Sequence, residues 1–189
     1  MTTAKILAFA GSNRKESFNR KALSLAVEGA RDAGAEVTVA DLRDYPMPIY
    51  DADFHHDSGV PATMLGLRKL MLSANGLLIA CPEYNASITP LLKNTIDWLS
   101  QTVDAHDGDV FGNKVCGLMG ASPGGFGTIR ALPHVSYIFS NLGTIVLPVV
   151  AVPKAHELMN ADGTVKNESA AKMLRTLGAK VANTISKLS

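Results

Sequence analysis

The chain has 189 residues, of which 47% are hydrophobic and 19% are charged, and this composition fits a single globular domain over residues 1–189. The formal net charge of +1 excludes a strong overall attraction to nucleic acid or to anionic lipid. The apolar stretches fall far short of the roughly 20 residues of a membrane helix, so we expect a soluble protein with no membrane partner.

Two cysteines, Cys81 and Cys116, bear on the cellular compartment. Both lie in apolar runs, and their spacing fits no metal site. We therefore expect buried free thiols, which are typical of a reducing environment. The sequence begins directly with a strand pattern and shows no secretion leader, so a cytoplasmic location is expected.

Apolar runs alternate with helix-patterned segments along the chain, which is typical of a parallel sheet covered by helices on both faces. The pattern predicts strands at residues 5–10, 36–41, 77–81, 114–121 and 144–149. It predicts helices at about 17–33, from 61 to just before 76, and at about 168–187, and Gly34 ends the first of them. Another helix begins at about 89, and a separate one after the fourth strand ends at about 142. The last helix is expected to bury Met173, Leu174, Leu177, Val181 and Ile185.

The segment at residues 45–59 contains two prolines, which predict an irregular loop. The adjacent His55 and His56 point in different directions, so the sequence favours a solvated pair over a metal site. A turn is expected later in the chain, at Asp162 and Gly163.

A polar turn at residues 11–20 joins the first predicted strand to the first predicted helix. Free backbone N–H groups and the positive end of the helix dipole converge in such a turn, which favours an anion there. Hydroxyls, amides and one guanidinium suit a phosphate monoester, and they belong to Ser12, Asn13, Arg14, Ser17 and Asn19. The turn has one glycine, so it is neither a three-glycine dinucleotide fingerprint nor a Walker loop. The structural alternative is a well-capped helix with Ser17 as N-cap and Arg14 solvated.

Two further loops follow the third and fourth predicted strands, at residues 82–88 and 122–128. In a parallel sheet of order 2-1-3-4-5, the flavodoxin-like order, these loops and the first polar turn open into one crevice. FMN has the shape for this crevice, with its phosphate at the first turn and its flat ring at the other two loops.

Three side chains of the loop at residues 82–88 bear on the ring. Tyr84 offers an aromatic face for stacking, and Asn85 offers an amide for the polar edge of the pyrimidine. A buried core tyrosine and a turn asparagine are the structural alternatives. Glu83 is expected to present its backbone and not to act as an acid, because flavin chemistry mainly requires orientation.

Four motifs together resemble the NADPH-dependent FMN reductase family, in the branch with bacterial chromate and quinone reductases. They are Gly11-Ser12-Asn13-Arg14 with Ser17 and Asn19, Pro82-Glu83-Tyr84-Asn85, Lys93-Asn94-Thr95-Ile96-Asp97-Trp98, and Ser122-Pro123-Gly124-Gly125. The motifs occur in the order of the family, and the similarity covers nearly the whole chain.

The resemblance implies a flavodoxin-like three-layer fold with bound FMN. It implies transfer of two electrons from NADPH or NADH to quinones, flavins, nitro or azo compounds, or chromate, and a homodimer or a dimer of dimers. By this resemblance, the phosphate is bound by Ser12, Arg14, Ser17 and Asn19, and Phe18 is a further cofactor-binding residue. The residues that line the ring are Pro82, Glu83, Tyr84, Asn85, Ser122 and Gly124.

Two other classes of function stay open. One is a flavodoxin-type electron carrier that serves protein partners, although the near-neutral charge gives the chain little to steer such a partner. The other is a flavin-free α/β regulator, which would leave Arg14 and the asparagines of the first turn without a role. We expect an enzyme with ping-pong kinetics, whose active site is completed by a second subunit through the segment at residues 45–59.

Overall fold

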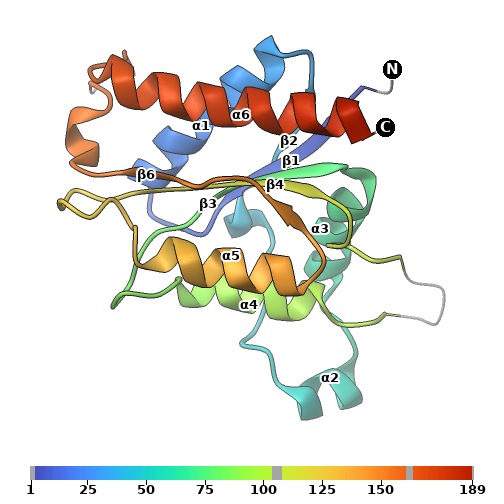
Figure 1. The fold of residues 1–189 in the computed structure, drawn as a ribbon. Coiled ribbons are helices and arrows are strands. Elements are labelled where there is room, and N and C mark those ends of the chain that lie inside the picture. Colours follow the sequence, from blue (N-terminus) through green and yellow to red (C-terminus); the bar gives the residue numbers. More distant parts are fainter. Residues whose placement is uncertain (1–2, 104–107, 161–163, 189) are drawn as a thin grey trace.

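The computed structural model describes residues 3–103, 108–160 and 164–188. Its centre is a parallel sheet of order β2-β1-β3-β4-β5, with β6 also paired to β4, which confirms the predicted order (Figure 1). The strands are β1 (Lys5–Ala10), β2 (Glu36–Val39), β3 (Gly76–Ala80), β4 (Val115–Ala121), β5 (Ile145–Val146) and β6 (Val150–Val152). The three central strands are buried almost throughout, as expected for apolar runs that helices cover on both faces.

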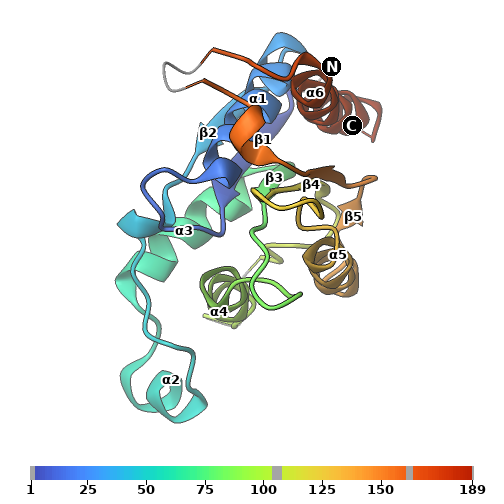
Figure 2. The same ribbon diagram turned by 90° about the vertical axis from the view of Figure 1, so that its left-hand side faces the viewer.

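Helices cover both faces of the sheet, so the fold has three layers (Figures 1 and 2). They are α1 (Phe18–Asp32), α2 (Ala52–Ser58), α3 (Ala62–Ser73), α4 (Pro90–Leu99), α5 (Ala131–Asn141) and α6 (Glu168–Leu188), with the short 3-10 helices η1 (Leu42–Asp44) and η2 (Ala155–Glu157). One buried apolar cluster lies between the sheet and the α1–α6 pair. The other lies between the sheet and α3, α4 and α5. None of the helices in the described residues has the length and hydrophobicity of a membrane-spanning segment.

The fifth predicted strand, at residues 144–149, is shorter in the structure, where it is β5, and β6 follows as a further strand that the sequence did not predict. β5 pairs with the first residues of β4, and β6 pairs with the last three. Pro148 lies between the two strands and has no N–H to donate to a sheet, which explains the interruption. β2 also ends earlier than predicted, at Val39, because Asp41 caps η1.

The segment at residues 45–59 is not wholly irregular, because it contains α2. The Asp51 carboxylate accepts hydrogen bonds from the N–H groups of Asp53 and Phe54, and Gly59 ends the helix with a φ of 73°. Asp51 and Gly59 are ordinary helix-cap signals, and they indicate a short helix here although the two prolines of the segment favour irregular structure. His55 packs against Trp98 with ring centroids 5.8 Å apart, whereas His56 is exposed.

Two side-chain expectations have different outcomes. Both cysteines are free and buried as predicted; burial raises the pKa of Cys81 to about 12 and also raises that of Cys116. Met173 is 47% exposed and not buried, because it lies outside the strip of α6 that faces α1 and the sheet. The turn predicted at 162–163 lies outside the described residues.

Candidate functional site

The three loops singled out in the sequence meet at the carboxyl ends of the central strands, and this end of the sheet faces the viewer in Figure 2. The Gly11 N–H donates to the Ala80 carbonyl over 2.9 Å, and the Thr89 hydroxyl donates to the Gly11 carbonyl over 2.8 Å. A Cβ atom on Gly11 would lie 2.8 Å from that of Leu92, so this close approach requires glycine. Hydrogen bonds and packing therefore fix the first turn against β3 and the start of α4.

The first turn presents unused backbone donors. The N–H groups of Asn13, Phe18 and Asn19 have no protein acceptor in the part of the chain that the structure describes. Ser17 is the N-cap of α1, and its hydroxyl accepts from the Arg20 N–H over 3.4 Å. The capped helix foreseen as an alternative is thus present, and the cap leaves the donors of the first helical residues free for an anion.

Arg14 adds a cation to these donors. Its side chain is exposed, and its guanidinium carbon lies 5.7 Å from the centre of the Phe18 ring. The Ser12 hydroxyl accepts from the Arg14 N–H over 3.3 Å, which holds the turn in shape. A helix N-terminus with free N–H groups and a guanidinium beside it fits a phosphate monoester.

Asn19 has a second task that the sequence did not reveal. Its side chain is buried, donates to the Ala121 carbonyl over 2.8 Å and accepts from the Ala121 N–H over 3.0 Å. This amide therefore ties the start of α1 to the end of β4, and the backbone N–H of Asn19 remains available for a ligand.

The loop after β3 makes a tight turn. Tyr84 and Ser87 exchange two backbone hydrogen bonds of 3.0 Å, and Asn85 and Ala86 between them have positive φ angles of 51° and 64°. The Tyr84 side chain is 56% exposed, so it is not a core tyrosine and its ring is accessible for stacking. Asn85 is a turn asparagine, as the alternative held, and is also exposed.

Glu83 joins the two loops expected around the ring. Its carboxylate accepts from the backbone N–H groups of Arg130 and Ala131, over 3.0 and 3.2 Å, at the start of α5. It also accepts from the Arg130 guanidinium over 2.7 Å. Burial alone would raise the pKa of Glu83, but these hydrogen bonds lower it, so the group stays ionised and is a poor proton donor. Arg130, which the sequence reading missed, lies 47 residues from Glu83, and no local pattern connects the two.

The loop after β4 is open on its outer side. Cβ atoms built on Gly124 and Gly125 would meet no atom within 4 Å, so a flat ligand can approach the backbone there. The inner side is fixed, because the Ser122 N–H donates to the Val152 carbonyl over 3.1 Å and the Lys154 N–H to the Gly124 carbonyl over 3.0 Å.

The spacing of the strands gives the size of the ligand that can use all three loops. β1, β3 and β4 are successive neighbours, so the first and third loops begin about 10 Å apart. Free donors lie at one end of this span, and an exposed aromatic ring and open glycines lie at the other. The arrangement fits a phosphate joined to a flat ring, as in FMN.

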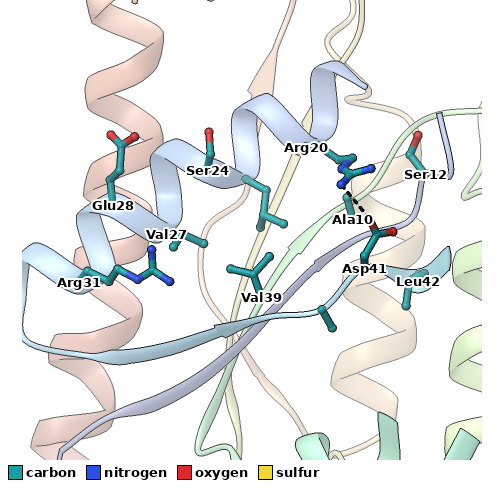
Figure 3. Close-up of a pocket in the computed structure, with 12 residues that line it drawn as sticks. Ala10, Ser12, Arg20, Ser24, Val27, Glu28, Arg31, Val39, Asp41 and Leu42 are labelled. Carbon is teal, nitrogen blue, oxygen red and sulfur yellow. Dashed lines mark hydrogen bonds and ion pairs between the residues drawn. The ribbon is translucent and has the colours of Figure 1, made fainter. Parts of the chain in front are cut away.

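Three hollows lie beside the first two of these loops. One of about 370 Å³ runs between α1 and β2, past Ser12, Arg20 and Asp41 (Figure 3). A second, of about 340 Å³, is lined by Asn13, Arg43, Tyr45 and their neighbours. A third, of about 570 Å³, lies between α4 and α5 and is mostly apolar. The described residues contain no group of three His, Cys, Asp or Glu side chains placed to hold a metal ion.

Comparison with known proteins supports the same ligand chemistry. The family model for NADPH-dependent FMN reductase matches residues 4–157. The chain is 32% identical over 173 residues to an NAD(P)H-dependent FMN reductase from Pseudomonas aeruginosa, covering 90% of this chain and 89% of that protein. It is 30% identical over 180 residues to a 2-hydroxy-1,4-benzoquinone reductase from Burkholderia, covering 94% of each. Among solved structures, the flavoenzyme NAD(P)H:(acceptor) oxidoreductase from Paracoccus denitrificans superposes with a TM-score of 0.81 at 26% identity, covering 98% of both chains.

Proposed function

Since the chain belongs to the NADPH-dependent FMN reductase family, and is thus an FMN-dependent NAD(P)H oxidoreductase, we propose that it passes two electrons to small quinones by a ping-pong mechanism. The similarity to a benzoquinone reductase over 94% of the chain supports this class of acceptor. Free flavins, nitro and azo compounds and chromate belong to the proposal as further acceptors. The near-neutral charge of the chain argues for a small acceptor and against a protein partner.

The proposed cofactor site follows from the donors and surfaces of the three loops. Ser12, Arg14, Ser17 and the free N–H groups of Phe18 and Asn19 hold the phosphate. The ring lies against residues of the other two loops, namely Pro82, Glu83, Tyr84, Asn85, Ser122 and Gly124. One observation supports this assignment most directly. The unused N–H donors lie about two strand spacings from the open glycines of the 122–128 loop, both at the carboxyl ends of the central strands.

When bound, FMN supplies the two-electron redox chemistry, and the chain supplies binding and orientation. Tyr84 and the backbone of the 122–128 loop would hold and orient the ring. Glu83 remains ionised and braces Arg130, so it has no proton to give to a substrate. A nucleotide and a quinone that used the same site one after the other would give the expected ping-pong kinetics.

We also propose that a second copy of the chain completes the site. α2 projects from the body of the molecule and has no buried residue (Figures 1 and 2). Beside it, Ile49 is 86% exposed and Phe54 is 42% exposed, and Tyr137 in the apolar hollow between α4 and α5 is 74% exposed. Such surfaces are commonly covered in symmetric assemblies. We therefore propose a homodimer or a dimer of dimers, in a reducing cytoplasmic setting that suits the two free thiols.

The decisive experiment purifies the protein, identifies the cofactor released by heat, and measures NADPH and NADH oxidation with a benzoquinone as acceptor. FMN and parallel double-reciprocal plots are expected. Release of FAD, absence of flavin after reconstitution, or no quinone-dependent oxidation would contradict the proposal. Light scattering on the active protein tests the second part, and an active monomer would contradict it.

A further inference from the structure

Two arginines share one carboxylate at the end of β2. The Asp41 carboxylate accepts from the Arg20 guanidinium over 2.8 Å and from the Arg43 Nε over 3.0 and 3.1 Å. Asp41 also caps η1, since it accepts from the Arg43 backbone N–H over 3.1 Å. These three groups carry a net charge of +1, and Asp44 adds a further negative charge that acts on Arg43.

The Asp41 carboxylate holds the two guanidiniums in place, but some of their N–H donors remain available to a ligand. Hydrogen bonding from Arg43 lowers the pKa of Asp41 to about 2, so the carboxylate is ionised at neutral pH. The side chains of Arg20 and Arg43 remain 36% and 45% exposed. Each guanidinium carries five N–H donors, and several on both residues have no acceptor within the described ranges.

The cluster lies beside the proposed phosphate site, toward β2. In Figure 3, Arg20 and Asp41 meet near Ser12, at one end of the trough between α1 and β2. Arg43 lines the neighbouring hollow with Asn13, so both hollows open beside the first polar turn. β2 follows β1 in the sheet, which places the cluster about 15 Å from the loop after β4.

The trough offers an apolar wall next to these charges. The Val39 side chain lines the trough and is 54% exposed, and the buried Val27 and Leu23 also line it. Its volume of about 370 Å³ lies within the range of roughly 300–1,000 Å³ that is usual for small-ligand sites. A flat heterocycle could cover the valine side chains while an attached phosphate reached the arginines.

We propose that Arg20 and Arg43 bind the adenosine 2′-phosphate of NADPH, with the adenine against the Val39 wall, and that Asp41 sets the balance between NADPH and NADH. The inference rests on the proposed function, because it requires the nicotinamide to stack at the Tyr84 rim. The 2′-phosphate is the one group that distinguishes NADPH from NADH, and paired guanidiniums match a phosphate dianion. A carboxylate in the same place favours a ribose hydroxyl instead, so the two residue types act in opposite directions.

The alternative is that the cluster only caps η1 and braces α1 against β2. Under that alternative, removing a charge alters stability and leaves nucleotide preference as it was. Arg43→Ala and Asp41→Asn separate the two cases, because asparagine retains an acceptor for the η1 cap. Arg31→Ala is a matched control, since Arg31 lies at the far end of the same trough and donates to the Val37 carbonyl over 3.1 Å.

The test measures flavin reduction in the flavin-loaded protein by stopped flow, with NADPH and with NADH, and takes the ratio of the two second-order rate constants. Arg43→Ala should lower the NADPH-to-NADH ratio at least about tenfold, the usual scale for a lost charge-assisted hydrogen bond. Asp41→Asn should raise the ratio, and Arg31→Ala should leave it at the wild-type value. Equal changes for both nucleotides in Arg43→Ala, or a falling ratio in Asp41→Asn, would overturn the proposal.

A binding measurement gives a second readout that does not depend on turnover. Adenosine 2′,5′-bisphosphate should bind the oxidised, flavin-loaded protein at least about tenfold more tightly than adenosine 5′-phosphate, and Arg43→Ala should abolish the difference. Equal binding of the two probes by the wild type would overturn the inference. A protein that binds no flavin, or is reduced by neither nucleotide, would instead contradict the proposed function.

Discussion

Replacing Arg14 with alanine should weaken FMN binding by about 1.5–3 kcal/mol, or roughly 10- to 150-fold in Kd. The structure indicates that this loss is local. Within the described residues, the one contact of the Arg14 guanidinium is the Phe18 ring at 5.7 Å, and an exposed cation–π pair contributes about 0.5–1 kcal/mol. Removing the side chain leaves no buried group without a partner. The free energy of unfolding should therefore fall by less than about 1 kcal/mol, and most of the effect should appear in phosphate binding.

The assay titrates the apoprotein with FMN and with riboflavin and follows flavin fluorescence. Riboflavin lacks the phosphate, so its Kd should hardly change in Arg14→Ala. Lys15→Ala is a matched control, because Lys15 is an exposed cation in the same turn with no proposed contact to the ligand. Equal losses for FMN and riboflavin, or the same loss in Lys15→Ala, would refute the reasoning that Arg14 holds the phosphate.

Three further predictions concern the hydrogen bonds between Asn19 and Ala121, the ion pair of Glu83, and the reaction with NADPH. Asn19→Ala leaves the buried N–H and carbonyl of Ala121 unpaired, so urea unfolding should show a loss of about 2–4 kcal/mol; a loss well under 1 kcal/mol would contradict the bracing role. The pKa of Glu83 is lowered in the folded state, so Glu83 stabilises the fold above the ordinary pKa of about 4.3, and this contribution disappears as the pH falls through its lower folded value. Acid unfolding curves should thus show a smaller loss of stability on acidification in Glu83→Gln than in the wild type, and parallel curves would contradict the prediction. Anaerobic mixing with NADPH should bleach the flavin band in one phase, and a quinone added afterwards should restore it; failure of both NADPH and NADH to reduce the flavin would instead favour an electron carrier.

The layers of the fold could be predicted because the pattern that encodes them is local. Apolar runs of strand length, separated by helical periodicity, are sufficient to indicate a buried parallel sheet. The polar turn at residues 11–20 could be recognised for the same reason, since its donors are consecutive in sequence. The early end of β5 was also encoded locally, in Pro148, but the strong apolar character of its neighbours outweighed that signal.

The cross-links of the site could not be predicted, because their partners are distant in sequence. Asn19 meets Ala121 across 102 residues, and Glu83 meets Arg130 across 47. Each residue alone is compatible with a ligand contact, a helix cap or a solvated surface. Which role applies depends on the register of neighbouring strands. The central strands of this sheet are buried on both faces and read as continuous apolar runs, which do not specify that register.

The two outer edges of the sheet have a bearing on how copies of the chain can associate. At one edge, β2 has four residues, and the Arg31 guanidinium donates to its Val37 carbonyl over 3.1 Å. At the other edge, β5 and β6 are short and are separated by a proline. Neither edge offers the long run of unpaired N–H and carbonyl groups on which an added strand grows. We therefore expect the protein to resist edge-to-edge aggregation even at high concentration, and its copies to join through helices and not through a continuous sheet.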